Sequence, residues 1–261
     1  MRVPFYQIDA FASRRFTGNP AAVMVLTDFA SDNALQAVAE ENNLAETAFI
    51  VPHGDGYRLR WFTPSVEVPL CGHGTLASAA VVMERLSPGR ADVIFETASG
   101  PLAVTRSGRS YVMNFPARPA RPVPASTGIA ASLGAEPVEL AWDGFNFLVR
   151  LADAETVRRL APDLPQISEL NCHGVIVTAT GDAGYDFVSR YFAPNKGIPE
   201  DPVTGGAHCA LAPFWTERLG KTEFKAFQAS ARGGEVVCRV LGGRVELEGT
   251  CIFYLEGEAE I

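Results

Sequence analysis

The sequence contains the same short passage twice, and this repeat constrains the fold more than any other feature. Residues 60–86 contain, in order, RWFTP, the glycine-rich turn CGHGT and an alanine-rich apolar run that ends in ERL. Residues 190–219 contain RYFAP, the turn DPVTGG and another apolar run that ends in ERL. The two copies lie half a chain apart, whereas solenoid repeats have periods of roughly 20–50 residues. The repeat therefore predicts a duplicated domain in which each copy is a strand, a glycine turn and a helix.

The chain is long enough for two domains, each with its own hydrophobic core. Four prolines between positions 116 and 124 mark the clearest linker. We therefore expect one domain over residues 1–116 and another over 117–261, with the last strand, about 250–261, pairing back into the first. The helix in each copy is apolar nearly all round and must be enclosed. The predicted class is α+β: two similar domains, each a curled, mostly antiparallel sheet wrapped around a central apolar helix.

Period-two alternation and turn residues predict the individual elements. A helix capped by Ser31 is expected to end at residues 42–43, and apolar helices are expected over 75–86 and after the second turn. The predicted strands cover residues 3–11, 21–26, 47–51, 57–62, 92–96, 102–106, 111–115, 138–141, 145–151, 175–179, 185–192, 223–228, 235–240, 244–248 and 251–255.

Charge and cysteine content exclude several classes of protein. The net charge of −8 argues against a nucleic-acid or anionic-membrane partner. We find no signal-peptide pattern at the N-terminus, and no apolar run reaches the ~18 residues of a membrane span. The five cysteines are scattered and odd in number, which indicates reduced thiols and a cytoplasmic location.

Glu46 is the first candidate for chemistry. It lies between small and apolar neighbours, in the stretch NLAETAF at residues 43–49. A half-buried carboxyl group there would suit a residue that takes and returns a proton. The alternative is a solvated acid at the start of a strand, which is the commoner place for an acidic side chain.

His73 and Cys71 lie at the start of the first apolar helix. The helix dipole is expected to lower the pKa of His73, leaving a neutral donor or acceptor, or else His73 is a structural residue of the turn. The same dipole is expected to lower the pKa of the Cys71 thiol and make it reactive. The alternative, a small buried hydrophobe, is better supported because the second copy has no cysteine there. No second histidine or cysteine lies at metal-ligand spacing, so no metal site is expected.

The second turn offers Asp201, either as an ordinary helix N-cap or as a polar partner for a ligand. Glycine turns let backbone N–H groups approach a carboxylate closely. His208 is expected to be packed, and Arg232 either balances a substrate charge or lies on the surface. The residues expected to line a substrate site are Asn19, Gly72, Gly74, Thr75, Gly205, Gly206 and Ala207.

The sequence resembles the phenazine-biosynthesis isomerase family (PhzF-like). The matching segments are IDAF (8–11), FTGNPAAV (16–23), NLAETAF (43–49), RWFTP (60–64), EV (67–68), CGHGTLA (71–77), GIPEDPVTG (197–205), QAS (228–230) and RGG (232–234). The resemblance implies a diaminopimelate-epimerase-like fold with the site between two similar domains. It also implies that Glu46 transfers the proton, that His73 and Asp201 help to bind substrate and assist, that no cofactor or metal is needed, and that the protein is a homodimer.

One departure from the family pattern, and one difference from related epimerases, bear on the reaction. The family usually has Thr-Gly-Ser-Ala where this chain has residues 204–207 (TGGA), so a hydroxyl is missing at Gly206. This argues against the dihydro-hydroxyanthranilate substrate best known for the family. Related two-thiol epimerases carry a cysteine in each turn, whereas this chain has Cys71 alone.

The sequence therefore predicts a cofactor-independent isomerase that moves a proton on a small carboxylate-bearing substrate, with Glu46 as general acid and base. Two alternatives remain. One is an amino-acid racemase or epimerase that uses Cys71 with Asp201 as the opposite base. The other is a non-catalytic protein that binds a small acid.

Overall fold

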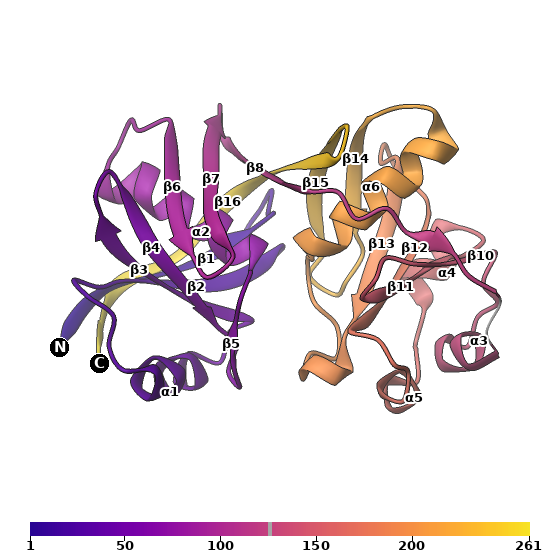
Figure 1. Cartoon of the computed structure of the whole chain (residues 1–261), viewed down its shortest axis with the longest axis horizontal. Helices are drawn as coiled ribbons and strands as arrows, with labels where there is room; N and C mark the ends of the chain where they lie inside the picture. Colours follow the sequence, from indigo (N-terminus) through magenta and orange to yellow (C-terminus); the bar gives the residue numbers. More distant parts are fainter. Residues whose placement is uncertain (125–126) are drawn as a thin grey trace. The chain divides into compact units, whose positions relative to one another are not determined.

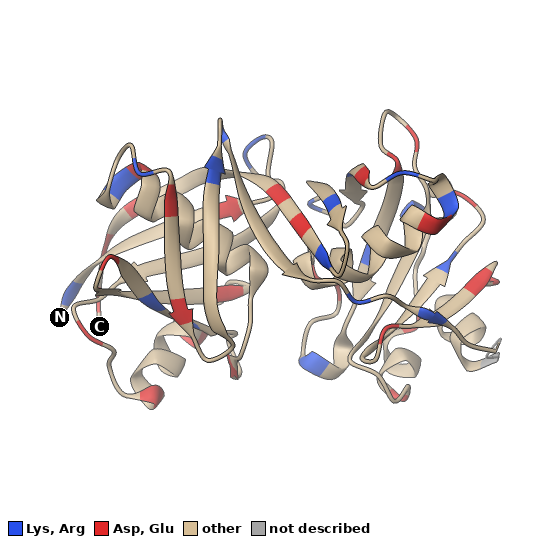
Figure 2. Cartoon of the chain, turned by 45° about the horizontal axis from the view of Figure 1, so that its top comes forward, with Lys and Arg blue, Asp and Glu red and all other residues tan. Residues whose placement is uncertain are grey.

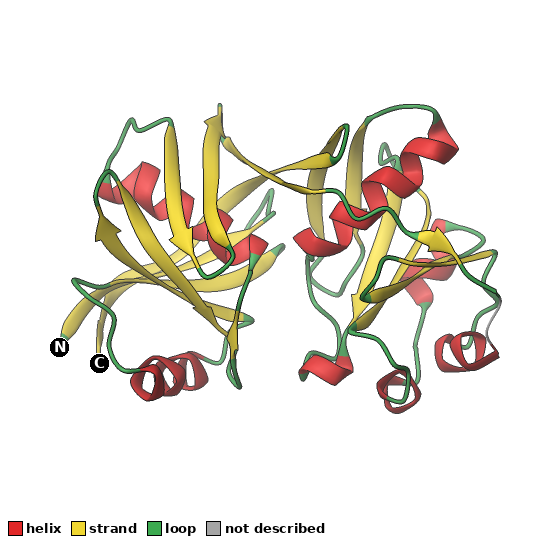
Figure 3. Ribbon diagram, in the orientation of Figure 1, coloured by secondary structure: helices red, strands yellow, loops and turns green. Residues whose placement is uncertain are grey.

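The computed structural model describes residues 1–124 and 127–261, and these form two compact units. Unit 1 consists of residues 1–114 and 248–261, and unit 2 consists of residues 115–247. The fold is mixed α/β and largely sheet (Figure 3). Strand β16 (Arg244–Glu260) contributes its first residues to unit 2 and the rest to unit 1.

In unit 1 the strand order returns on itself. Strand β16 is the neighbour of β8 and also pairs with β1, so the order β1-β2-β3-β4-β6-β7-β8-β16 closes. The elements of this unit are β1 (Arg2–Ala10), β2 (Asn19–Val25), α1 (Asp32–Asn42), β3 (Glu46–His53), β4 (Gly56–Phe62), β5 (Glu67–Val68), α2 (Gly72–Val81), a π-helical turn η1 (Val82–Leu86), β6 (Asp92–Thr97), β7 (Gly100–Ser107) and β8 (Ser110–Pro116).

Two helices cover opposite faces of the strands β1 to β4. Helix α2 contacts β1, β2 and β3, and nearly all of its residues are buried (Figure 1). Helix α1 packs its Leu35 and Ala39 against the other face, which explains why β2 and β3 are apolar on both sides. Ser31 caps α1 by accepting from the Ala34 N–H, and Asn43 ends it in the left-handed region, as the sequence predicts.

Side-chain alternation along β3 decides which helix each residue meets. Phe49 and Val51 lie in the cluster with α1, and Thr47 accepts a hydrogen bond from Asn42 of α1 at 3.1 Å. Glu46 is an odd number of positions away from these residues, so its side chain points to the opposite face of the strand, toward α2. The same alternation along β2 turns Met24 toward α1 and Asn19 toward α2.

Unit 2 has the strand order β16-β15-β14-β13-β12-β11-β10-β9. Its elements are β9 (Arg121–Pro122), α3 (Thr127–Leu133), β10 (Glu139–Trp142), β11 (Asn146–Arg150), α4 (Ala154–Arg159), α5 (Leu164–Ser168), β12 (Gly174–Thr180), β13 (Phe187–Phe192), a 3₁₀ turn η2 (Pro194–Lys196), α6 (Gly205–Leu219), β14 (Glu223–Gln228) and β15 (Gly234–Leu241).

Strand β12 shows that both faces of this second sheet are covered. Val175 and Val177 belong to the core cluster that includes residues of α3, α4 and α5. Thr178 has the opposite parity, and its hydroxyl accepts from the Trp215 indole N–H of α6 at 3.1 Å. Full enclosure accounts for the continuous burial of residues 174–179 of this strand.

Three features of the fold differ from the sequence prediction. The strands expected at 244–248 and 251–255 are one strand, β16, because residues 249 and 250 continue the strand between them. The helix expected over 75–86 begins at Gly72, and its last turn is the π-helical η1. Helices α3, α4 and α5 were not predicted, since they are too short to show a helical period.

Lys and Arg residues, and Asp and Glu residues, are both spread over several elements of each unit (Figure 2). Within the described residues, no helix has the length and apolar character required to cross a membrane.

Candidate active site

Glu46 and His73 form a buried pair in unit 1. The carboxylate Oε2 of Glu46 lies 2.9 Å from Nε2 of His73, and the two side chains are only 12% and 6% exposed. Glu46 is the first residue of β3, and His73 is the second residue of α2. Glu46 lies on the face of β3 that is turned toward α2, and His73 lies at the start of α2. The fold therefore brings together two residues that are far apart in the sequence.

The other ring nitrogen of His73 has two neighbours. Asn19 Nδ2 lies 3.2 Å from Nδ1, and Cys71 Sγ lies 3.5 Å from it. Asn19 is completely buried at the start of β2 and supports His73 from inside the unit. His73 is thus held from both ends, with a carboxylate at Nε2 and an amide and a thiol at Nδ1.

Cys71 is the N-cap of helix α2. Its sulfur accepts a hydrogen bond from the Gly74 N–H at 3.2 Å, the contact that a serine or aspartate oxygen makes in other helices. A Cβ at Gly74 would lie 2.9 Å from the Trp61 ring and 3.1 Å from the Cys71 sulfur. Only glycine fits there, because Trp61 packs directly on this turn.

Both pKa expectations at this turn are corrected by the structure. Burial first, and then the negative charge of Glu46, raise the pKa of the Cys71 thiol instead of lowering it. Burial by itself would lower the pKa of His73, but Cys71 and Glu46 outweigh burial and hold this pKa well above the ordinary value. The sequence argument considered the helix dipole alone and could not include the carboxylate that lies 2.9 Å from Nε2.

Among the described residues, Glu46, Cys71 and His73 are the group whose donor atoms lie close enough together to suggest a metal site, all within 4.8 Å of one another. The spacing argument from sequence missed this group, because Glu46 is distant in the chain. However, His73 faces Glu46 with Nε2 and Cys71 with Nδ1, and the two nitrogens of an imidazole point in diverging directions. As placed, the ring separates the carboxylate from the thiol, which suits proton transfer better than joint coordination of one ion.

In unit 2, Asp201 is buried but does not cap α6. Thr204 occupies the N-cap position, and its hydroxyl donates to Asp201 Oδ2 at 2.5 Å. The backbone N–H of Asp201 donates to the carbonyl of Tyr191 at 3.0 Å. Asp201 is therefore fixed next to the helix start, and the ordinary capping interpretation is ruled out.

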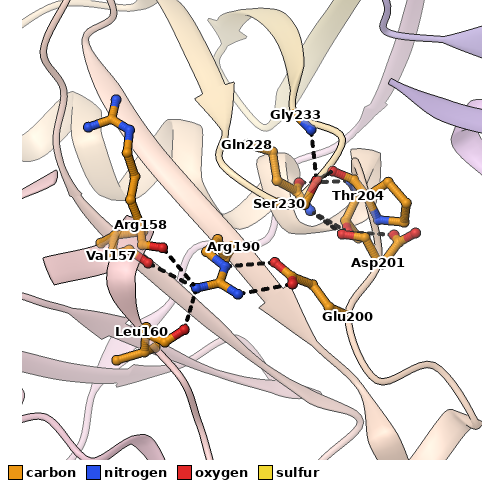
Figure 4. Close-up of polar contacts among 11 residues, drawn as sticks. Val157, Arg158, Leu160, Arg190, Glu200, Asp201, Thr204, Gln228, Ser230 and Gly233 are labelled. Carbon is orange, nitrogen blue, oxygen red and sulfur yellow. Dashed lines mark hydrogen bonds and ion pairs between the residues drawn. The ribbon is translucent and has the colours of Figure 1, made fainter. Parts of the chain in front are cut away.

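The segment QAS at residues 228–230 holds this loop in place (Figure 4). Gln228 accepts from the Thr204 N–H and donates to the carbonyl of Asp201, both at 2.8 Å. The Ser230 hydroxyl donates to the carbonyl of Pro202 at 2.8 Å. These side chains position Asp201 and the start of α6.

Several predicted backbone donors are already used inside the helix starts. The Thr75 N–H donates to the Cys71 carbonyl, the Gly74 N–H donates to the Cys71 sulfur, and the Ala207 N–H donates to the Thr204 carbonyl. Among the residues that the structure describes in these two turns, the backbone N–H groups of Gly72, Gly205 and Gly206 do not take part in these contacts. Gly206 is exposed, whereas Gly205 and Ala207 are buried.

His208 is packed, as expected. Its Nδ1 lies 2.8 Å from the Thr204 carbonyl oxygen, and its ring lies beside Phe187. Burial lowers the pKa of His208 to about 4, so the ring is neutral at physiological pH.

Comparison with known proteins confirms the resemblance noted in the sequence. The profile of the PhzC-PhzF family, described as phenazine biosynthesis-like protein, matches residues 8–257. Two Pseudomonas aeruginosa proteins, each named an uncharacterized isomerase, are 48% and 45% identical to the chain, with 98% and 100% of both partners covered. A PhzF-family crystal structure from Enterococcus faecalis is 44% identical, covers both chains completely and superposes with a TM-score of 0.97. The chain therefore belongs to the PhzC-PhzF family of phenazine biosynthesis-like proteins.

Proposed function

We propose that the protein is a cofactor-independent isomerase in which Glu46 moves a proton on a small carboxylate-bearing substrate. The observation that carries the proposal is the buried Glu46–His73 pair at the start of α2. Its relatives that carry the name isomerase support the reaction class. A carboxylate that is only 12% exposed and held by one histidine is a restrained, partly dehydrated base.

In this proposal the Glu46 carboxylate removes a proton from a substrate carbon. The electron pair of that C–H bond moves into an adjacent conjugated system, and Glu46 returns the proton to a different carbon. His73 contacts the carboxylate through Nε2 and holds it in position for the transfer. General acid–base catalysis accounts for about 10²–10⁴ of the rate, and positioning of the substrate must supply much of the rest.

The charged end of the substrate needs donors near this pair. The N-terminus of α2, with the open amide of Gly72, has the polarity that favours a carboxylate. The involvement of Asp201 and of the start of α6 in the same reaction stays a prediction from the sequence resemblance.

The test is deuterium exchange in heavy water, using a panel of small unsaturated carboxylic acids. Wild type is expected to place deuterium on carbon in at least one of them, and Glu46→Gln is expected to lose at least about 10²-fold of that rate. Glu40→Gln, an exposed position on α1, is the matched control. Exchange by Glu46→Gln at the wild-type rate would rule out the mechanism.

A racemase that uses Cys71 is the second candidate, favoured by the contact between its sulfur and His73. The raised pKa and the capping bond to Gly74 argue that the thiol stays protonated and structural. Cys71→Ser keeps an N-cap and is therefore expected to keep most of the proton-transfer rate. Loss of that rate in Cys71→Ser, with the fold intact by circular dichroism, would favour the racemase.

A further inference from the structure

Trp61 lies on the same face of its sheet as Glu46. In the antiparallel pair of β3 and β4, Trp61 is opposite Ala48, two positions along β3 from Glu46. Side chains alternate along a strand, so Ala48 and Glu46 point to one face, toward α2. Phe49 and Phe62, which have the other orientation, belong to the cluster with α1. Trp61 and Glu46 are therefore diagonal neighbours, within the reach of long and aromatic side chains.

The pyrrole edge of the Trp61 indole meets the first turn of α2. A Cβ built on Gly74 would lie 2.9 Å from Trp61 Cδ1 and 3.4 Å from Trp61 Nε1. His73, which contacts Glu46, is the residue before Gly74 in this turn. The two strands therefore bring a carboxylate and an indole N–H to adjacent residues of one helix start.

The indole N–H of Trp61 is a buried donor that has no acceptor among the residues that the structure describes. Trp61 is only 1% exposed. By contrast Trp215, the other deeply buried tryptophan, donates its N–H to the Thr178 hydroxyl at 3.1 Å. A buried donor without an acceptor is costly, so one that the protein itself leaves unpaired points to an acceptor on a ligand.

We propose that the Trp61 indole N–H is a catalytic donor, and that it binds the substrate oxygen on which negative charge develops when Glu46 removes the proton. An indole N–H only donates and carries no charge, so it selects an oxygen lone pair rather than a cation. The proposal rests on the proposed function. It restricts the substrate to acids in which the carbon that loses the proton is conjugated with a carboxylate or carbonyl oxygen.

The electron balance of the reaction places the charge on that oxygen. The C–H bond breaks, its proton goes to the Glu46 carboxylate, and its electron pair forms a new carbon–carbon double bond. The π electrons of the conjugated C=O group move to its oxygen, which accepts from Trp61. The pair returns when Glu46 gives the proton to a different carbon. A donor fixed in a buried site lowers the barrier because it does not have to reorient as the charge develops.

The binding test uses formate, the smallest carboxylate, and the indole N–H signals in a ¹⁵N–¹H NMR titration of the full chain. The chain has three tryptophans, and Trp142→Phe and Trp215→Phe each remove one signal, which assigns the third to Trp61. Formate is expected to shift the Trp61 signal saturably and to leave the other two in place. A Trp61 signal that shows no saturable shift would overturn the proposal.

The kinetic test is deuterium exchange by Trp61→Phe, which keeps an aromatic ring against Gly74 but removes the N–H. The donor acts on charge that develops in the transition state, so kcat is expected to fall at least about tenfold while KM changes little. Trp215→Phe is the matched control, because it loses the same group from unit 2. A kcat for Trp61→Phe no lower than that of Trp215→Phe, with both folds intact by circular dichroism, would also overturn the proposal.

The failure of this proposal can be distinguished from failure of the proposed function. Glu46→Gln is expected to shift the Trp61 signal with formate as wild type does, because it leaves the donor in place. Exchange by Glu46→Gln at the wild-type rate would remove the mechanism. Exchange that requires Glu46 but proceeds at full kcat in Trp61→Phe would remove only the role of Trp61.

Discussion

At the scale of single residues, His73 joins the elements of the candidate site. Its Nε2 contacts Glu46, and its Nδ1 faces Asn19 and Cys71. The sequence indicated each of these residues as a candidate, but it gave no reason to place three of them around one ring. That arrangement depends on which side chains of β2 and β3 face α2. The packing of α1 and α2 on opposite faces of these strands decides this.

Removal of the Asn19 amide should slow the reaction without abolishing it. Asn19→Leu keeps the side-chain volume but leaves Nδ1 of a buried histidine with one partner fewer. A lost buried hydrogen bond of about 1–2 kcal/mol corresponds to roughly a tenfold lower kcat. Because Asn19 acts through His73, the pH profile of kcat is also expected to shift.

The control for this prediction is Asn42→Leu, which loses a hydrogen bond from the side-chain amide to Thr47 on the α1 side of β3. It is expected to lower stability while leaving the pH profile unchanged. A pH profile that shifts equally in both variants would show that Asn19 is merely structural.

His208 should make the protein less stable in mild acid. Burial lowers its pKa from 6.5 to about 4. Between these values the unfolded chain binds a proton that the folded chain does not, so the free energy of unfolding rises with pH. The contribution is fully present above pH 6.5 and is lost as the pH falls toward 4, by at most ~3 kcal/mol.

Urea unfolding at several pH values between 4 and 7 checks this prediction. His208→Gln is expected to flatten the pH dependence, whereas His53→Gln, at an exposed position, is expected to leave it unchanged. A wild-type free energy of unfolding that stays constant over this range would contradict the assignment.

At the scale of secondary structure, most strands were predictable because period-two alternation and turn residues carry a strong signal. The start and end of α1 were equally clear from Ser31 and Asn43. The short helices α3 to α5 were not predictable, because five to seven residues are held mainly by the sheet they cover. The pKa directions at the start of α2 were also beyond sequence reasoning, since they depend on how close Glu46 lies.

Each copy of the repeat begins with an arginine that forms a bidentate pair with a later glutamate. Arg60 binds both oxygens of Glu67, and Arg190 binds both oxygens of Glu200 (Figure 4). Arg190 also donates to the carbonyl of Leu160 at 2.6 Å, at the end of α4. The second pair therefore connects the end of α4 to the loop that carries Asp201.

Arg190→Gln is expected to destabilise the protein by about 2–4 kcal/mol, because it leaves Glu200 and buried carbonyl groups without their partner. Arg58→Gln removes an exposed pair with Asp28 and should cost less than about 1 kcal/mol. Chemical denaturation of both variants measures the difference. Equal effects would mean that the Arg190 pair is no more than a surface contact.

At the scale of the whole molecule, the duplicated motif explains why each unit has an apolar helix that starts at a glycine turn. The repeat can be recognised from the sequence because the same residue types occur in the same order in both copies. The two copies have nevertheless diverged at the site. The start of helix α2 has Cys71, His73 and the nearby Glu46. The start of helix α6 has Asp201, Thr204 and Gly206.

The last strand links the two units through the chain itself. Strand β16 leaves unit 2 and pairs with β1 from Ala10 to Arg2, so the two chain ends lie side by side. Ala259 and Ile261 also pack against the cluster beneath α1. Unit 1 therefore depends on residues that follow the whole of unit 2 in the sequence.

A chain that ends at Glu248 should consequently lose stability in unit 1 and keep it in unit 2. Without residues 249–260 of β16, the β1 backbone has a strand on one side only, and its N–H and C=O groups on the other side are open to water. Hydrogen exchange is expected to show β1 amides losing protection, while those of β12, which pairs with β11 and β13, stay protected. A chain that ends at Glu258 keeps most of the pairing and serves as the control. Full protection of β1 in the shorter chain would show that unit 1 folds without its last strand, and the closed strand order would then contribute little to the stability of the site.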